Sequence, residues 1–383
     1  MNIGKRIAAI CIALFAFVLP ACANADKPAE NRIAVEGAGI IHEEKFGGVY
    51  ITLTIDEFNE RGFTYGDSVN IEFSNGFILT DIPYYNGFYV DMGEPLLVAY
   101  PGYPYIRAGY NNGDDMYAVA RLDKDDTASI RLNEKAKYLD EQNAMDIHYS
   151  DEQGERSDEV FANFRAVNAG DLKENTLYRS ASPCDNQHKR AAVSDRLAMG
   201  AGINFMLNLS DDENELREHI EGEDFDSPHF LSLYNAGKVA PLSLSMAYKS
   251  ETFSQKLAAG LRALSACEGP FLVHCVEGKD RTGFVCAVIE ALAGATYDEI
   301  VDDYMITYYN YYGIDKRSDP VKYRIIKEKN IDVMLEFIAG DNGADITNAD
   351  YSACADGYLT GIGLTLEEVN ALKARFVKPN RSD

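Results

Sequence analysis

Hydrophobic positions follow two different patterns along the chain. Between residues 33 and 128, short apolar runs with alternating or β-branched residues predict strands, among them 49–54, 69–73, 95–100 and 116–122. Asn75-Gly76 favours a hairpin turn after the second of these runs. Several short strands separated by turn residues are typical of a small β-barrel or sandwich, which we assign to residues 33–135.

In residues 158–378, helical periods alternate with short apolar runs. Helices are predicted at 188–199, 251–266 and 283–292, and buried strands at 202–210 and 271–273. Residues 221–250 contain glycine, proline and serine and predict an irregular insertion. The alternation predicts an α/β fold with a parallel-rich sheet flanked by helices. The polar residues 135–158 predict a domain boundary, and one continuous domain with a long surface loop is the alternative.

The loop between the strand at 271–273 and the following helix carries the strongest chemical signal. Cys275 and Arg281 bracket it, and Gly278 lies inside it. Backbone N–H groups of such a loop converge on one point, and the helix dipole adds positive potential there. An anion bound at that point would meet the planar guanidinium of Arg281, and the same field favours thiolate at Cys275. These residues predict a nucleophile aimed at phosphorus, the alternative being a buried structural cysteine beside a surface arginine.

The run from His274 to Gly283, His-Cys-x-x-Gly-Lys-Asp-Arg-Thr-Gly, resembles the signature of the atypical bacterial tyrosine phosphatase family. The resemblance resumes at Phe164 and extends to about residue 378, with Leu-Tyr-Arg-Ser-Ala at 177–181 as a further motif. It implies a cysteine-phosphatase fold in residues 158–378 and hydrolysis of phosphotyrosine through a phosphocysteine intermediate. It also implies possible action on phosphoserine, phosphothreonine, phosphoinositides or inositol phosphates.

The resemblance implies roles for the residues of the loop. Cys275 is the expected nucleophile, Arg281 holds the phosphoryl oxygens, and Thr282 hydrogen-bonds the sulfur. His274 is expected to orient the loop through a hydrogen bond to the backbone, with a plain buried histidine as the alternative. The substrate-binding residues are expected to be Val276, Glu277, Gly278, Lys279 and Arg179.

Asp280 is the preferred proton donor for the leaving group. The chain contains no tryptophan, so the Trp-Pro-Asp loop of many cysteine phosphatases is absent. The alternative for Asp280 is a structural carboxylate bonded to loop N–H groups. The family usually has Asp-Leu-Arg where this chain has Asn208-Leu209-Ser210, and Asn208 cannot transfer a proton. Residues 211–213 are acidic and could supply a carboxylate, although an acidic helix start is the simpler interpretation.

Two basic residues, Lys279 and Arg179, are open to more than one interpretation. Lys279 fits a substrate with a second phosphate, or it only offsets Glu277 and Asp280. Arg179 meets the substrate or holds the loop, and a surface or second-layer ion pair is the alternative.

The formal net charge of −25 makes nucleic acid and bare anionic membrane improbable partners. The partner we expect is therefore a phosphorylated protein or a phosphoinositide. The expected chemistry needs no metal or cofactor, and the histidines are scattered along the sequence.

Residues 1–25 have the organisation of a signal peptide. Lys5 and Arg6 precede an apolar run, and Ala23-Asn24-Ala25 is a small-residue cleavage site. A lipoprotein is equally open, with lipid on Cys22 as the only membrane attachment. We therefore expect an exported protein that is periplasmic, extracellular or lipid-anchored at the cell surface. A transmembrane helix is the alternative, but the run is shorter than the ~20 residues of a span.

Two hypotheses of other classes remain at this point. The first is a non-catalytic surface binding module with the β domain as its working part. The second is a sulfur-transfer enzyme, which also presents a cysteine on a loop. The arginine six positions after Cys275 and the neighbouring Thr282 favour phosphate over sulfur transfer.

Overall fold

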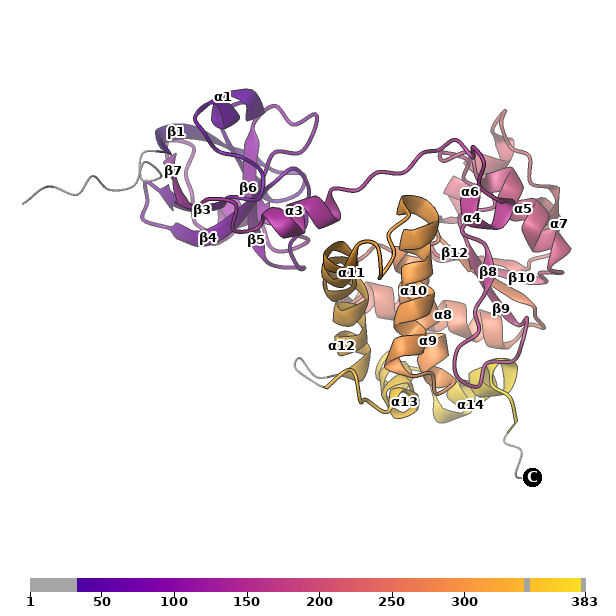
Figure 1. Ribbon diagram of the computed structural model, residues 1–383. Coiled ribbons are helices and arrows are strands. Elements are labelled where there is room, and N and C mark those ends of the chain that lie inside the picture. The colour runs from indigo at the N-terminus through magenta and orange to yellow at the C-terminus, as the bar shows by residue number, and fades with distance from the viewer. Residues whose placement is uncertain (1–32, 341–344, 380–383) are drawn as a thin grey trace, which may run out of the picture.

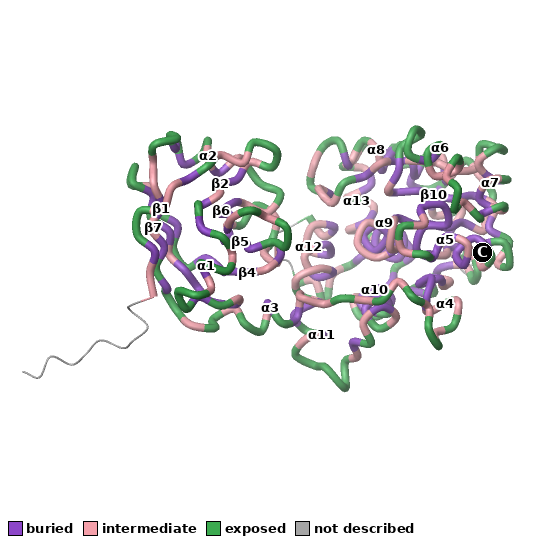
Figure 2. The backbone as a smooth tube through the Cα atoms, turned by 90° about the horizontal axis from the view of Figure 1, so that it is seen from above, coloured by how far each residue is buried: buried purple, intermediate pink, exposed green. Residues whose placement is uncertain are grey.

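The computed structural model describes residues 33–340 and 345–379. The predicted signal peptide and Cys22 lie outside the described residues. The described chain forms a barrel and a mixed α/β part, which lie side by side (Figures 1 and 2). Residues 135–157, here called the connecting segment, join the last strand of the barrel to the first helix of the α/β part. Each part has its own hydrophobic interior.

Seven strands close the barrel in the order β1-β2-β6-β5-β4-β3-β7. All of their pairings are antiparallel except β4 with β5. Closure leaves no free sheet edge. The strands are β1 (Ala34–Glu43), β2 (Gly48–Ile51), β3 (Ser68–Phe73), β4 (Ile78–Tyr85), β5 (Pro95–Val98), β6 (Ile106–Tyr110) and β7 (Thr127–Glu134), with helices α1 (Ile55–Glu60) and α2 (Met116–Val119) between them.

The strand predicted at 116–122 is wrong, because the chain forms the short helix α2 there. The Asp115 side chain accepts a hydrogen bond from the backbone N–H of Tyr117 at 3.0 Å and caps that helix. Met116 is fully buried and anchors α2 to the barrel interior.

A five-stranded sheet with the order β11-β10-β12-β9-β8 organises the α/β part. The pairings of β10 with β11, β10 with β12 and β12 with β9 are parallel, and β8 with β9 is antiparallel. The mixed α/β character predicted from the sequence is confirmed. The strands are β8 (Arg165–Ala166), β9 (Leu177–Ser180), β10 (Phe205–Asn208), β11 (Val239–Pro241) and β12 (Phe271–His274).

Helices cover both faces of this sheet. Phe271 and Val273 of β12 belong to the larger interior, and Leu272 belongs to a separate cluster on the other face. On the side of that cluster lie α4 (Asp158–Phe161), α5 (Ala191–Gly200), α6 (Glu213–Glu221) and α7 (Pro228–Asn235). On the other side lie α8 (Glu251–Ser265), α9 (Asp280–Leu292), α10 (Tyr297–Tyr312), α11 (Pro320–Lys327), the π-helical turn η2 (Glu328–Asp332), α12 (Val333–Ala339), α13 (Tyr351–Gly361) and α14 (Leu366–Phe376).

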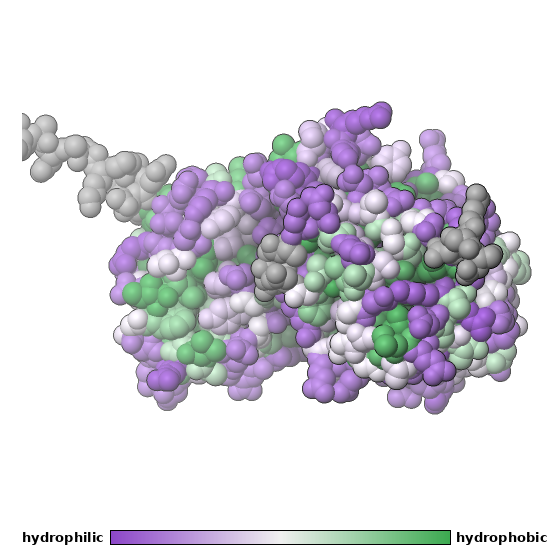
Figure 3. Space-filling view, turned by 90° about the horizontal axis from the view of Figure 1, so that it is seen from below, coloured by the Kyte–Doolittle hydropathy of each residue, from purple (hydrophilic) through white to green (hydrophobic). Residues whose placement is uncertain are grey.

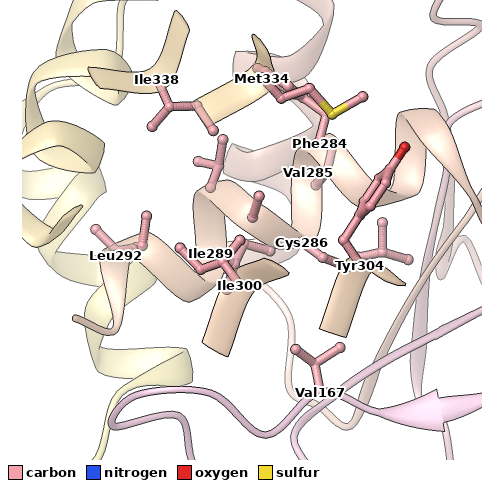
Figure 4. Close-up of a cluster of buried hydrophobic side chains, with 14 of the residues drawn as sticks. Val167, Phe284, Val285, Cys286, Ile289, Leu292, Ile300, Tyr304, Met334 and Ile338 are labelled. Atoms are coloured by element: carbon pink, nitrogen blue, oxygen red, sulfur yellow. The ribbon is translucent and has the colours of Figure 1, made fainter. Parts of the chain in front are cut away.

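The central helix of the α/β part is α9. Every residue from Thr282 to Leu292 is buried, and side chains from α10, η2–α12 and the segment around Val167 pack around it (Figure 4). A helix buried on all sides has little freedom to shift. Its N-terminal turn, which carries Arg281, is therefore held in a fixed place.

Residues 221–250 are more regular than predicted. They contain α7, which has Pro228 in its first turn, and β11, which extends the parallel sheet beside β10. Helix α3 (Leu139–Met145) in the connecting segment packs against α11.

The surface is mainly hydrophilic on the face in Figure 3, with hydrophobic side chains confined to separate patches. Within the described residues, no helix has both the length and the apolar character needed to cross a membrane.

Candidate active site

The predicted loop connects the end of β12 to the start of α9. His274 ends the strand, Cys275 follows and is 3% exposed, and the helix begins at Asp280. Gly278 has a φ of +66°, and a Cβ there would lie 2.1 Å from the carbonyl oxygen of Ser180. Backbone conformation and close approach to the end of β9 therefore both require glycine at this position.

Hydrogen bonds from surrounding groups hold the carbonyl oxygens of this loop. Each carbonyl from position 276 to 279 accepts at least one. The donors are Ser182 N to Val276 O (3.0 Å), Tyr311 Oη to Glu277 O (2.5 Å), Asn163 Nδ2 and Arg179 Nη2 to Gly278 O (3.1 and 3.0 Å), and Arg179 Nη2 and Gly283 N to Lys279 O (3.2 and 2.8 Å).

The N–H groups of the loop can face the side opposite to its carbonyl oxygens. In a planar trans peptide, the N–H of one residue points away from the carbonyl of the residue before it. Among the described residues, no acceptor is hydrogen-bonded to the backbone N–H groups of residues 276–282. These groups and the start of α9 form a donor-lined cradle, residues 275–282, that is organised for an anion.

Arg179 lies behind the cradle, and the structure corrects its assignment as a substrate-binding residue. Its side chain is 1% exposed and donates to the two loop carbonyls and to Asp303 Oδ2 at 2.6 Å. Asp303 also pairs with Arg165 at 2.9 Å. Burial by itself raises the pKa of Asp303, but the two guanidinium groups outweigh it and lower the pKa to about 2. Arg179 therefore holds the loop, which was the other interpretation of the sequence.

Lys279 is paired within the loop. Its Nζ lies 3.3 Å from Glu277 Oε2, 3.7 Å from Asp280 Oδ2 and 3.3 Å from Tyr312 Oη. Burial by itself lowers the pKa of Lys279, but Asp280 and the other neighbours outweigh it and raise the pKa well above its usual value. The structure thus agrees with the interpretation that Lys279 offsets two carboxylates.

Asp280 is the first residue of α9, and its side chain is 31% exposed. Its Oδ1 accepts a hydrogen bond from Tyr304 Oη at 3.0 Å. Arg281 is half-buried, and its Nη1 donates to the carbonyl of Leu244 at 3.0 Å. That bond uses one of the five guanidinium donors and fixes the direction of the group.

Two buried groups, the His274 ring and the Thr282 hydroxyl, were expected to form hydrogen bonds at the loop. Neither ring nitrogen of His274 has a partner, and Thr282 Oγ1, which is also buried, has none either. Burial lowers the pKa of His274 to about 4, against a weaker raising effect of Asp211, so the ring is neutral at pH 7. The prediction that Thr282 bonds the sulfur is therefore wrong for this structure, and the prediction that His274 orients the loop through its backbone stays a prediction.

Asn208 and Asp211 form a buried pair, and Asn208 lies beside His274 on the neighbouring strand. Asn208 Nδ2 donates to Asp211 Oδ2 at 2.8 Å, and its Oδ1 accepts from the backbone N–H of Asp211 at 3.1 Å. Asp211 is not part of an acidic helix start, because Asp212 is the residue that caps α6. Although no ligand cluster was visible in the sequence, ligand atoms of Asp211, Asp185 and His219 lie within 4.8 Å of one another.

Sequence reasoning missed Tyr149, which lies in the connecting segment and reaches the loop. Its hydroxyl donates to Glu277 Oε1, and its ring stacks on Tyr311 with centroids 4.9 Å apart. The polar composition of the connecting segment gave no signal for this contact.

Comparison with known proteins bears on the α/β part of the chain. Residues 161–378 match the sequence model of the Tyrosine phosphatase family. A tyrosine-protein phosphatase of Nostoc commune is 28% identical over 201 residues, which are 47% of this chain and 67% of that protein.

Two solved structures match the chain at low similarity. The core catalytic domain of the PP-IP phosphatase SIW14 from S. cerevisiae is 19% identical, with 46% of this chain and 90% of that chain covered and a TM-score of 0.27. P. aeruginosa TpbA in complex with pTyr is 17% identical, with 53% and 96% covered and a TM-score of 0.27.

A family match over more than half of the sequence settles the class of protein. The chain belongs to the tyrosine phosphatase family, and as an enzyme it is a protein-tyrosine phosphatase. The hypothesis of a non-catalytic binding module is thereby set aside.

Proposed function

We propose that this protein hydrolyses phosphate monoesters, phosphotyrosine first among them, through a phosphocysteine intermediate on Cys275. The observation that carries the proposal is the cradle at residues 275–282. Its carbonyls are held from outside, and none of its N–H groups at 276–282 has an acceptor in the described chain. Such a cradle resembles the signature loop of the atypical bacterial tyrosine phosphatases and would bind the three non-bridging oxygens of a phosphate ester.

In the first step, the thiolate of Cys275 attacks phosphorus in line with the ester oxygen. The S–P bond forms while the P–O bond to the leaving group breaks. Loop N–H groups and the remaining donors of Arg281 stabilise the charge on the equatorial oxygens. The leaving oxygen takes a proton from the carboxyl of Asp280, whose side chain is partly exposed.

In the second step, water attacks phosphorus and the S–P bond breaks. Asp280 takes the proton from the water, inorganic phosphate leaves, and Cys275 returns to the thiolate. The proton that Asp280 gives in the first step returns to it from the water in the second, and the water supplies the attacking electron pair.

The substrate class follows from the charges around the loop. A second phosphate would need a free cation beside the cradle, and Lys279 is already shared between Glu277 and Asp280. We therefore favour phosphotyrosine over phosphoinositides and inositol phosphates. A panel of these substrates, compared by kcat/KM, tests the preference.

We also propose export, on the sequence of residues 1–25 alone. The mass of the mature protein distinguishes cleavage after Ala25 from lipid attached to Cys22. A mature protein that retains Lys5 and Arg6 would contradict both forms.

The test of the activity is hydrolysis of p-nitrophenyl phosphate by the mature chain and by Cys275→Ser. We expect the substitution to abolish turnover, because serine is a far weaker nucleophile here. Cys354→Ser is the matched control, since that cysteine is also free but lies on α13, away from the loop. Activity that survives Cys275→Ser would overturn the mechanism.

A further inference from the structure

Tyr149 brings the connecting segment into contact with the candidate active site. Its hydroxyl donates to a carboxylate oxygen of Glu277, a residue 128 positions away in the sequence. The ring stacks on Tyr311, whose own hydroxyl holds the carbonyl of Glu277 at 2.5 Å. Both the backbone and the side chain of Glu277 are therefore held by tyrosines.

The segment around Tyr149 is held on the α/β part by Arg190. The Arg190 guanidinium lies 4.8 Å from the centre of the Tyr149 ring and donates to Ser150 O and Asp151 Oδ1, both at 3.1 Å. His188 Nδ1 lies 3.0 Å from the same Asp151 oxygen. These contacts fix the segment at Tyr149 and at the two residues that follow it.

Glu277 poses an electrostatic problem for the cradle. Burial by itself raises the pKa of Glu277, but Lys279 and the Tyr149 hydroxyl outweigh it and lower the pKa, so the side chain is an anion at pH 7. A carboxylate inside a loop that attracts anions can turn inward and occupy it, and it also repels a phosphate dianion.

The structure shows the carboxylate turned to the outside. Oε1 accepts from Tyr149, and Oε2 lies 3.3 Å from Lys279 Nζ. Among the described residues, no loop N–H donates to either oxygen. Lys279 divides its charge between Glu277 and Asp280, whereas the Tyr149 hydroxyl donates to Glu277 and has His188 Nε2 as a more distant neighbour at 3.4 Å.

We propose that Tyr149 is a positioning residue of this phosphatase, whose hydroxyl keeps the Glu277 carboxylate outside the cradle and so keeps the cradle open to substrate phosphate. The inference rests on the proposed function, in which the cradle at residues 275–282 binds the phosphate of the substrate. It makes the connecting segment part of the site.

The test uses Tyr149→Phe, Glu277→Gln and the double variant of the full mature chain. Phenylalanine keeps the ring on Tyr311 and removes the hydroxyl. For Tyr149→Phe we expect KM for p-nitrophenyl phosphate and Ki for inorganic phosphate to rise about tenfold, while kcat changes less than about threefold, because binding of the anion is what the freed carboxylate opposes.

The double variant shows whether Tyr149 acts by positioning the Glu277 carboxylate or only by packing against its neighbours. If Tyr149 acts through the charge of Glu277, adding Tyr149→Phe to Glu277→Gln changes KM by less than about twofold. Tyr309→Phe removes an exposed hydroxyl of α10 and should leave KM unchanged. A tenfold loss that persists in the Glu277→Gln background, or no rise of KM in Tyr149→Phe, would overturn the inference.

Failure of the proposed function would look different. If the wild-type chain shows no turnover, or if turnover survives Cys275→Ser, the proposed mechanism is wrong. An active, Cys275-dependent enzyme whose KM does not depend on Tyr149 removes the positioning role alone.

Discussion

Gly278 shows how one residue sets the shape of the cradle. Alanine there would adopt a φ of +66° and place its Cβ 2.1 Å from Ser180 O, so the loop has to move. We expect Gly278→Ala to lower the free energy of unfolding by about 1–3 kcal/mol and kcat/KM by about a hundredfold, because small displacements of reacting groups are costly.

The comparison for Gly278 is Gly76→Ala in the barrel. Gly76 has a φ of +91°, but a Cβ there meets nothing within 4 Å. Thermal unfolding should show a loss of stability for this variant as well, and kinetic assays should show no loss of activity. Equal kinetic losses in both variants would mean that Gly278 does not shape the site.

Asp280 can be tested through the leaving group. Asp280→Asn keeps an acceptor for Tyr304 but cannot give a proton. We expect kcat to fall by about 10²–10⁴ for phosphotyrosine and much less for p-nitrophenyl phosphate, whose leaving group needs little protonation. Equal losses on both substrates would mean that Asp280 has a structural role.

How far the sequence predicts single residues depends on how local their contacts are. Cys275, Gly278 and Arg281 share one loop, so their spacing could reveal them. The sequence placed Arg179 near the loop but could not show whether it lies on the side that would bind substrate or on the opposite side. Tyr149 was invisible, because its contact with Glu277 depends on how the connecting segment lies on the α/β part.

At the scale of elements, the helix that carries the site was predictable, but the surroundings of the buried carboxyl in it were not. The apolar run after Gly283 predicted α9, which is buried on all sides (Figure 4). Glu290 lies in that helix and is 1% exposed. The sequence could not show what surrounds this carboxyl, because its neighbours Asp303 and Arg179 come from other elements.

Glu290 predicts a pH dependence of stability. Burial, reinforced by Asp303, raises its pKa well above the usual value. A carboxyl whose pKa is higher in the folded state takes up a proton on folding, so its contribution to stability falls as pH rises above the unfolded pKa. We expect Glu290→Gln to gain in melting temperature over wild type as pH rises from 5 to 8.

Glu299→Gln serves as the control for Glu290, because Glu299 caps α10 and its pKa is lowered by hydrogen bonds to Thr296. A carboxylate with a lowered pKa contributes stability that is already complete at pH 5. The difference between this variant and wild type should therefore stay constant from pH 5 to 8. A Glu290→Gln difference that is equally constant would show that Glu290 is ionised in the folded protein.

Two mispredicted elements show where local signals compete. Apolar residues at 116–122 predicted a strand, but the capping side chain of Asp115 starts a helix. Residues 221–250 looked irregular because they contain proline and glycine, yet Pro228 lies at the helix position that tolerates it. Turn residues mark the boundaries of elements as well as loops.

At the scale of the whole molecule, the connecting segment does more than join two parts. Helix α3 packs against α11, Lys329 lies 3.5 Å from Asp91 of the barrel, and Tyr149 contacts the loop. The sequence predicted a polar boundary at 135–158 but not its attachment to the α/β part, which depends on contacts between distant residues. The connecting segment therefore provides a path of contacts from the barrel to the cradle, beside the direct contact of Lys329 with Asp91.

Substitution of Arg190 can break the contact between the connecting segment and the α/β part. Its guanidinium donates to Phe161 O at 2.9 Å, His188 O at 2.8 Å and the two acceptors on the segment, and lysine cannot reproduce that planar set of donors. We expect Arg190→Lys to detach residues 146–157, so that trypsin cuts at Arg156 about tenfold faster and KM rises as it does in Tyr149→Phe. The control is Arg196→Lys. Arg196 lies on α5 and forms an exposed ion pair with Asp158, so this substitution should change neither the rate of cleavage nor KM. If cleavage accelerates while KM stays constant, the connecting segment only joins the two parts and does not affect the site. If the rate of cleavage and KM rise together, attachment of the connecting segment to the α/β part and affinity for phosphate are coupled.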